Sequence, residues 1–404
     1  MSEWKEATIG ELAEKIAMGP FGSNIKIETF KPYGIPIISG THLCETRMRD
    51  KDFNFISKEH ADRLANSNVF RGDVIFTHAG NIGQVSFIPK NSKYERYIIS
   101  QRQFYLRCNS NVLDYEYITY YFKSPYGQYQ LLANANQTGV PSLAQPVSYL
   151  KSIKILLPPL PEQRAIASVL SSLDDKIDLL HRENKTLEAM AETLFRQWFI
   201  EEAKDEWEEK SLKDIYIFEK GFEPGSENYL ETEEEDAIRF IRVGDMLSHT
   251  PSVYIKKSLA KSICSADDLL MSFDGTPGRL NFGIEGAYSS GIRRIYSLNP
   301  VYDNLGLKYL IFKSKHIQDT VNAHSSGTVI LHASSSIDEL TFSFPDERKL
   351  EEFNEMITPI FSKIQLNKRQ FRILEKLRDT LLPKLMSGEV RVKYVEEEMA
   401  SCRA

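Results

Sequence analysis

An internal repeat constrains the fold of this 404-residue chain more than any other feature. Matching segments recur in the same order about half a chain apart: Trp4 with Trp207, Gly22-Ser23 with Gly225-Ser226, Ile37–Gly40 with Ile241–Gly244, Gly72–Gly83 with Asp267–Gly278, Tyr120–Ser124 with Leu310–Ser314, Thr138–Val140 with Gly327–Val329, and Pro158 with Pro345. The offset shrinks along the chain, which is what a duplication with small deletions leaves. The sequence therefore predicts two versions of one folding unit.

Each unit ends in a segment whose apolar residues recur at alternating steps of four and three, the pattern of a coiled-coil seam. The first seam is Ile166, Leu170, Leu173, Ile177, Leu180, Asn184, Leu187, Ala191, Leu194 and Trp198. The second is Phe353, Ile357, Ile360, Ile364, Asn367, Phe371, Leu374, Arg378, Leu381 and Leu385, each 187 positions after its counterpart. We expect two long helices that pair with each other.

Two asparagines and two prolines interrupt the pattern of these helices. Asn184 and Asn367 occupy seam positions, where a buried amide lowers stability but fixes the register of the two helices. Pro359 should bend the second helix or delay its start, and Pro383 should mark its end, because proline lacks the amide hydrogen that a helix interior needs.

The regions before the helices contain short strand-like runs separated by Gly, Pro and Asn, such as Val74–Pro89, Tyr97–Arg107 and Val147–Pro158, mixed with helix around Leu113–Gln130. The predicted fold class is α/β (α+β): two pseudo-repeated globular domains, each followed by a long helix, with the two helices forming an antiparallel coiled coil. The predicted boundaries are residues 1–157 for the first domain, 158–204 for its helix, 205–345 for the second domain, 346–391 for its helix and 392–404 for a tail.

The net charge of −6 at first argues against a nucleic-acid partner, because Lys and Arg carry phosphate binding. Residues 1–157 are net basic, however, and much of the acidic excess lies in Glu231–Asp236, most simply a solvated loop. DNA binding is therefore not excluded. Four cysteines without a CxxC pair, no apolar run as long as a membrane span and no signal peptide predict a chain of the reducing cytoplasm that does not bind a membrane.

Several short segments are similar to catalytic motifs, but each lacks a part that the motif requires. Asn299–Tyr302 is similar to the NPPY loop of amino-methyltransferases but lacks the second proline, and no glycine-rich cofactor loop precedes it. Pro345–Lys349 is similar to a nuclease signature but stands at a helix entrance, where acids suit the helix dipole. There is no P-loop, and His324 with His332 is too isolated to indicate zinc. We predict no catalytic residue, no metal site and no cofactor on this chain.

Several motifs together resemble those of one family. They are the GPFGS loop, IPIISG, GDVIFTHAGNIGQV, YIISQRQ, the run from TGVPSL through LKSIKILLPPLPEQR into the first seam, and the late LLPKLMSGEV. By these motifs the chain resembles, over essentially its whole length, the specificity subunits of type I restriction-modification systems. The proline-rich entry into the heptad run is the most specific part.

The resemblance implies a DNA-binding function and a set of partners. The two globular domains would be target recognition domains, each reading one half of a bipartite double-stranded DNA target, and the coiled coil would space them. Two methyltransferase subunits and up to two restriction/translocase subunits would join this non-catalytic chain. They would methylate adenine or cleave unmodified DNA with S-adenosylmethionine, ATP and Mg²⁺ bound on the partners.

The best candidates for DNA contact are polar residues at turns between apolar strands, since amide and basic side chains contact base edges and phosphates. In the first domain they are Thr77, His78 and Asn81, then Gln101, Arg102 and Gln103, with Ser23, Asn24 and Lys26 suited to phosphate. In the second they are Ser272, Asp274, Thr276, Arg279, Asn281, Arg293 and Arg294. The same residues could instead serve turn geometry or a solvated strand edge.

Two other functions stay open from the sequence. One is an enzyme with a divergent methyltransferase or nuclease site, and the other is a coiled-coil adaptor that binds only proteins. Methylation assays with the pure chain would test the first. DNA binding in the presence of the methyltransferase partner would test the second.

Overall fold

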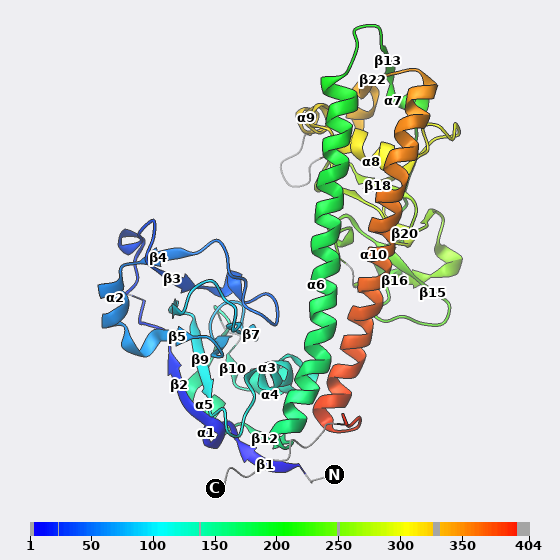
Figure 1. Cartoon of the computed structure of the whole chain (residues 1–404). Helices are drawn as coiled ribbons and strands as arrows, with labels where there is room; N and C mark the ends of the chain where they lie inside the picture. Colours follow the sequence, from blue (N-terminus) through cyan, green and yellow to red (C-terminus); the bar gives the residue numbers. More distant parts are fainter. Residues whose placement is uncertain (1–3, 23, 137–138, 249–250, 326–331, 394–404) are drawn as a thin grey trace, which may run out of the picture. The chain divides into compact units, whose positions relative to one another are not determined.

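A computed structural model describes residues 4–22, 24–136, 139–248, 251–325 and 332–393. The chain divides into two compact units: unit 1 comprises residues 1–175 and 375–404, and unit 2 comprises residues 176–374. Each unit holds one globular domain and a stretch of both long helices (Figure 1). Among the described residues, no helix has the length and apolar character needed to cross a membrane.

The globular domain of unit 1 combines short strands with short helices and ends in a long helix. Its strands are β1 (Lys5–Thr8), β2 (Ala13–Met18), β3 (Ile35–Ile38), β4 (Asn54–Ile56), β5 (Asn68–Phe70), β6 (Val74–Thr77), β7 (Val85–Phe87), β8 (Arg96–Ile99), β9 (Gln103–Cys108), β10 (Ala135–Asn136), β11 (Ser142–Leu143) and β12 (Lys154–Leu157). Its helices are α1 (Ile9–Leu12), α2 (Lys58–Arg63), α3 (Tyr115–Lys123), α4 (Pro125–Leu132), α5 (Pro146–Ser152) and the start of α6 (Leu160–Arg196).

Two four-stranded sheets organise this domain. One has the order β2-β9-β6-β7 and is antiparallel throughout, and the other has the order β4-β3-β8-β5 with a parallel pair, β3 and β8. The strand β6 is buried along its whole length, with Val74 and Phe76 in one apolar cluster and Ile75 in another, because both faces of its sheet are covered. The strands β1 and β12 pair separately.

Unit 2 repeats this arrangement. Its strands are β13 (Glu208–Ser211), β14 (Ile217–Lys220), β15 (Ala237–Ile241), β16 (Tyr254–Lys256), β17 (Ile263–Cys264), β18 (Leu269–Ser272), β19 (Leu280–Asn281), β20 (Gly286–Tyr288), β21 (Ile292–Tyr296) and β22 (Thr341–Phe344), and its helices are α7 (Leu212–Ile215), α8 (Leu305–Lys313), α9 (Lys315–Ala323) and most of α10 (Glu347–Ser387). The sheet orders β14-β21-β18-β19 and β16-β15-β20-β17, with β15 and β20 parallel, match those of unit 1 strand for strand. The predicted fold class is confirmed.

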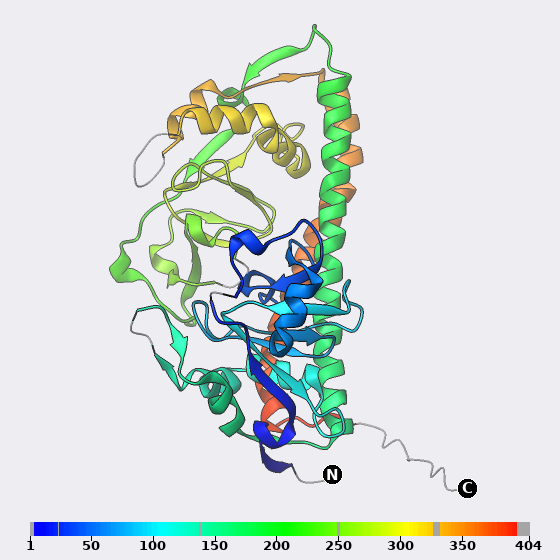
Figure 2. The ribbon, with the colours of Figure 1, turned by 90° about the vertical axis from the view of Figure 1, so that its left-hand side faces the viewer.

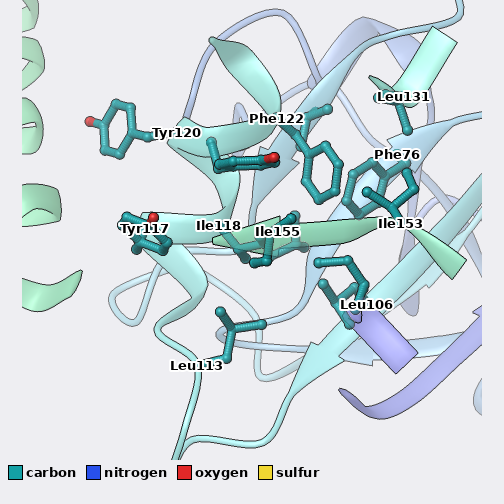
Figure 3. Close-up of a cluster of buried hydrophobic side chains, with 14 of the residues drawn as sticks. Phe76, Leu106, Leu113, Tyr117, Ile118, Tyr120, Phe122, Leu131, Ile153 and Ile155 are labelled. Carbon is teal, nitrogen blue, oxygen red and sulfur yellow. The ribbon is translucent and has the colours of Figure 1, made fainter. Parts of the chain in front are cut away.

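The main core of unit 1 lies between α3, α4 and the antiparallel sheet. Phe76 on β6 packs edge to face on Phe122 of α3, with ring centroids 5.4 Å apart, and Leu131 of α4 lies beside them (Figure 3). Leu106 and Ile155 close the cluster from β9 and β12 (Figure 3). The end of β6 is thus packed against α3 and α4, and the turn that follows it starts from this core.

The long helices pair in antiparallel directions within each unit. In unit 1, Asp174 on α6 accepts a hydrogen bond from Arg378 on α10 (2.9 Å), whereas Glu162, earlier on α6, pairs with Arg391, beyond the end of α10. In unit 2, Ile177 of α6 packs near Phe371. The ring centroid of Phe199, just after the end of α6, lies 4.9 Å from that of Phe353. Later residues of the first helix therefore contact earlier residues of α10. Both views show α6 and α10 side by side within unit 2 (Figure 2).

Every residue of the two predicted seams is buried or half-buried.

The prediction that Pro383 marks the end of the second helix is wrong. The helix α10 begins at Glu347, runs through Pro359 and Pro383, and ends at Ser387. The loss of one backbone hydrogen bond at Pro383 is offset because Leu385 and the residues around it are buried in the core of unit 1. Gly388, with φ of 75°, then ends the helix in the left-handed conformation that glycine adopts without strain.

Candidate nucleic-acid interface

The turn after β6 meets two other segments at one end of the first domain. The amide of His78 donates to the carbonyl of Arg102 (2.9 Å), and the carbonyl of His78 accepts from the amide of Leu143 (2.8 Å). Ala79 and Ser142 form an isolated antiparallel bridge beside these bonds. We call this meeting point the first tip; it comprises residues 77–83, 100–103 and 139–143.

The loop after β2 lies against the first tip. The amide of Gly19 donates to the carbonyl of Gln103 (2.8 Å), and this close approach leaves no room for a side chain at Gly19. Asn24 and Lys26 are exposed on this loop. Ser23, the third residue predicted to hold phosphate, lies outside the described residues.

Four predicted contact residues present polar groups at the surface of the first tip. Asn81, Gln101 and Arg102 are exposed, and His78 is half-buried with its Nε2 atom 3.0 Å from the carbonyl of Gln101. The guanidinium of Arg102 lies over the turn, because a Cβ atom added to Gly80 would be 3.4 Å from its Nη1 atom. The amides and the guanidinium are groups that contact base edges and phosphates.

Two other predicted residues support the tip from inside. Thr77 is 2% exposed and donates to Oε1 of Gln84 (3.0 Å), while Gln103 is 1% exposed and its Nε2 atom lies 3.4 Å from Oγ1 of Thr77. The side-chain Nε2 atom of Gln84 in turn donates to the carbonyl of Gly40 (3.1 Å). These placements do not support direct DNA contact by Thr77 or Gln103. A role for Gln84 was not predicted from the sequence, although a polar amide residue directly before an apolar strand was a signal that could have indicated one.

The corresponding turn of unit 2 is held by the same backbone bonds. The amide of Phe273 donates to the carbonyl of Gly291 (2.8 Å), and its carbonyl accepts from the amide of Ala333 (2.8 Å). Asp274 and His332 form the isolated antiparallel bridge here. We call this meeting point the second tip; it comprises residues 272–279, 289–292 and 332–334.

The second tip exposes fewer free polar groups than the first. Thr276 is exposed, and Asp274 is partly exposed with its Oδ1 atom 2.8 Å from Nδ1 of His332. Arg279 is half-buried, and its Nη1 atom donates to the carbonyl of Val243 (3.3 Å). This bond ties the turn to a neighbouring loop, as the bond from Gln84 to Gly40 does in unit 1.

Ser272 and Asn281 are buried at the base of the second tip. The hydroxyl of Ser272 donates to the carbonyl of Thr276, and the side-chain amide of Asn281 donates to the carbonyl of Met246. Both side chains are thus used to shape the turn, and their positions do not support direct DNA contact.

The two adjacent arginines of β21 are also used within the domain. Arg293 is 6% exposed and donates to the carbonyl of Ser290 (2.6 Å), and burial lowers the pKa of its guanidinium. Arg294 donates to Oε2 of Glu219 (2.7 Å) and lies 3.6 Å from Asp268. Neither placement supports the DNA contact that the sequence predicted.

Within the described ranges, no group of three or more His, Cys, Asp or Glu residues could hold a metal ion. Asn299 accepts a hydrogen bond from the amide of Val301 (3.1 Å), and Tyr302 is buried against Phe344. Asn299–Tyr302 is therefore a turn with a structural tyrosine.

The seam contains one buried polar pair. Nδ2 of Asn367 donates to Oδ1 of Asn184 (2.9 Å) and to Oε2 of Glu183 (3.0 Å), and Asn184 donates to the carbonyl of Ile364 (3.4 Å). Asn184 and Asn367 are 6% and 0% exposed. The hydrogen bond between the two side chains forms at a single alignment of α6 and α10, although the buried Oδ1 atom of Asn367 has no hydrogen-bond partner among the described residues.

The chain is similar to known proteins in sequence and in fold. A family model described as "Type I restriction modification DNA specificity domain" matches residues 1–189, which cover the first globular domain and most of α6. The second half repeats the sheet orders of the matched half. By this match the chain is similar to the DNA specificity subunits of type I restriction-modification systems.

Relatives in this family match over nearly their whole length. The type I restriction enzyme MjaIX specificity subunit of Methanocaldococcus jannaschii is 26% identical, covering 97% of both chains. The putative MjaX specificity subunit of the same organism is 21% identical over 97% of this chain and 94% of its own. The crystal structure of a type I system S subunit from M. genitalium has the same fold, with a TM-score of 0.59 at 17% identity over 95% of this chain and 96% of its own.

Proposed function

We propose that this chain is the DNA specificity subunit of a type I restriction-modification complex and that each tip reads one half of a bipartite duplex sequence. One observation carries this proposal: two tips with the same backbone bonds display different polar side chains. A duplicated scaffold with variable groups at one place is what two half-sites of different sequence require. Fixed turns hold such groups where base edges can meet them.

The partners follow from the family. Two methyltransferase subunits and up to two restriction/translocase subunits would carry S-adenosylmethionine, ATP and Mg²⁺, while this chain supplies recognition and no catalytic group. The loop beside the first tip, with Asn24 and Lys26, would hold phosphates, because sugar and phosphate contacts position a protein on the duplex.

We keep the boundaries from the sequence as part of the proposal: recognition domains at residues 1–157 and 205–345, spacer helices at 158–204 and 346–391, and a tail at 392–404. The helices would set the distance between the two half-sites. The cytoplasm is the proposed compartment, where the free thiols of Cys44, Cys108 and Cys264 would stay reduced.

Methylation mapping of the assembled complex tests the assignment of one tip to each half-site. His78→Ala with Asn81→Ala should weaken the sequence requirement in one half-site, and Thr276→Ala with Arg279→Ala should weaken it in the other. The half-site read by the unchanged tip serves as the internal control for each variant. If both variants alter the same half-site, the assignment is wrong.

The pure chain separates this function from the two alternatives. Incubated with DNA and S-adenosylmethionine, it should transfer no methyl group, and methylation by the chain alone would indicate an enzyme. With its methyltransferase subunit it should retard a duplex that contains the mapped target. Failure to bind that duplex would indicate an adaptor for proteins only.

A further inference from the structure

The two tips carry different chemistry at the same backbone position. The isolated bridge joins Ala79 to Ser142 in the first tip and Asp274 to His332 in the second. In both units the residue just before the bridge makes the same two backbone hydrogen bonds. Asp274 therefore occupies the place of Ala79, and His332 occupies the place of Ser142.

A second position also differs between the tips, and here the first tip carries the charged residue. The carbonyls of Arg102 and Gly291 accept the same backbone bond in their respective tips, so these two residues are equivalent. Arg102 is exposed. A Cβ atom on Gly291 would lie 3.0 Å from Cβ of Asp274 and 3.3 Å from its Oδ2 atom, so the glycine leaves room for the carboxylate. One tip thus presents a cation where the other presents an anion.

These two groups suit different bases. A guanidinium donates to the O6 and N7 acceptors of guanine in the major groove, whereas a carboxylate accepts from the N4 amino group of cytosine. Asp274 has its Oδ1 atom engaged by His332, 2.8 Å away, and its Oδ2 atom lies beside Gly291. The carboxylate is held in one orientation and keeps an oxygen for a donor.

His332 also addresses the charge of an acidic group near DNA. A carboxylate close to phosphates is repelled. The Nδ1 atom of the His332 imidazole lies 2.8 Å from Oδ1 of Asp274, and a hydrogen bond there disperses part of the negative charge of the carboxylate. The side chain of His332 is 62% exposed, whereas that of Asp274 is 26% exposed, so the histidine is the outer member of the pair.

We propose that Asp274, oriented by His332, reads the amino group of a cytosine in the half-site bound by unit 2, and that Arg102 reads a guanine in the half-site bound by unit 1. This assignment rests on the proposed function. The assignment goes beyond the proposed function by naming one base pair in each half-site and the residue that reads that base pair.

Methylation mapping of the complex with Asp274→Asn tests the assignment. The substitution keeps the size of the side chain and replaces one acceptor oxygen by an amide donor, which pairs with adenine rather than cytosine. One cytosine position of one half-site should lose its preference roughly tenfold to a hundredfold, with adenine gaining there. His332→Ala should weaken the preference at the same position, because the carboxylate loses its fixed orientation.

A matched control and a reciprocal variant complete the experiment. Glu285→Gln makes the same carboxylate-to-amide change at an exposed site just before β20, whose other end leads into the tip, and should leave the target unchanged. Arg102→Ala should relax a guanine position in the other half-site. If Asp274→Asn leaves the target unchanged, relaxes a base pair without cytosine or alters the half-site that Arg102→Ala alters, the proposal is overturned.

The mapping also distinguishes this inference from the proposed function. A wild-type complex that methylates no bipartite sequence would contradict the proposed function itself. A wild-type complex with a bipartite target that Asp274→Asn does not alter would contradict the cytosine assignment alone.

Discussion

In both tips, side chains that point inward hold the turn in place, and side chains that point outward are available to contact DNA. Thr77 and His78 are neighbours, yet Thr77 is buried and His78 reaches the surface. Thr77 still belongs to β6 and pairs with Gln103 of β9, so both side chains enter the interior on the same face of the sheet. The sequence predicted the turn from its Gly and Asn residues. It could not predict the direction of each side chain, because this depends on the register with a strand distant in sequence.

Gln84 provides a test of this distinction by stability. Gln84→Ala would remove the acceptor of the buried Thr77 hydroxyl and the donor to the Gly40 carbonyl, so we expect the free energy of unfolding to fall by about 1–3 kcal/mol. Asn81→Ala, at an exposed position of the same turn, should change it by less than about 0.5 kcal/mol. Urea unfolding of the two variants measures both values. Equal losses in both would mean that the turn is not anchored through Gln84.

The paired helices show both the strength and the limit of sequence periodicity. The spacing of apolar residues predicted each seam position, because only one face of each helix is buried against the other. It did not predict the partner of each asparagine. The repeat makes Phe371 the counterpart of Asn184 and Leu180 the counterpart of Asn367, and Leu180 and Phe371 lie together in one apolar cluster. The amide pair therefore has an apolar counterpart, which departs from the symmetry of the repeat.

The asparagine pair should act on alignment more than on stability. Asn367→Leu leaves the buried Oδ1 atom of Asn184 without its donor, so we expect a loss of about 1–3 kcal/mol in the free energy of unfolding. Asn184→Leu combined with Asn367→Leu should recover most of that loss, because apolar seam residues pack well without hydrogen bonds. Chemical unfolding of the single and double variants gives the coupling between the two sites. Additive losses would show that the two amides do not depend on each other.

At the scale of the whole molecule, the duplication explains which parts of the sequence kept their spacing. Equivalent residues of the tips lie 189 to 195 positions apart, whereas all ten seam pairs lie 187 apart. A deletion in a loop is tolerated, but a deletion in a seam turns every later residue away from the partner helix. The sequence thus predicted the two-unit architecture well. The base-reading groups were harder to predict because they sit where the two copies have diverged.

The proposed role of the helices as a spacer predicts the effect of lengthening them. Four residues inserted after Arg182, with four more after Lys368 on the facing stretch of α10, add about one turn, or about 6 Å, to each helix while the pairing on both sides is kept. Since successive base pairs are about 3.4 Å apart, the unspecified gap in the target should grow by roughly one or two base pairs. The two half-sequences should stay the same, because neither tip is altered. Methylation mapping of the variant against the wild type measures both, and an unchanged gap with altered half-sequences would show that the helices do not set the spacing.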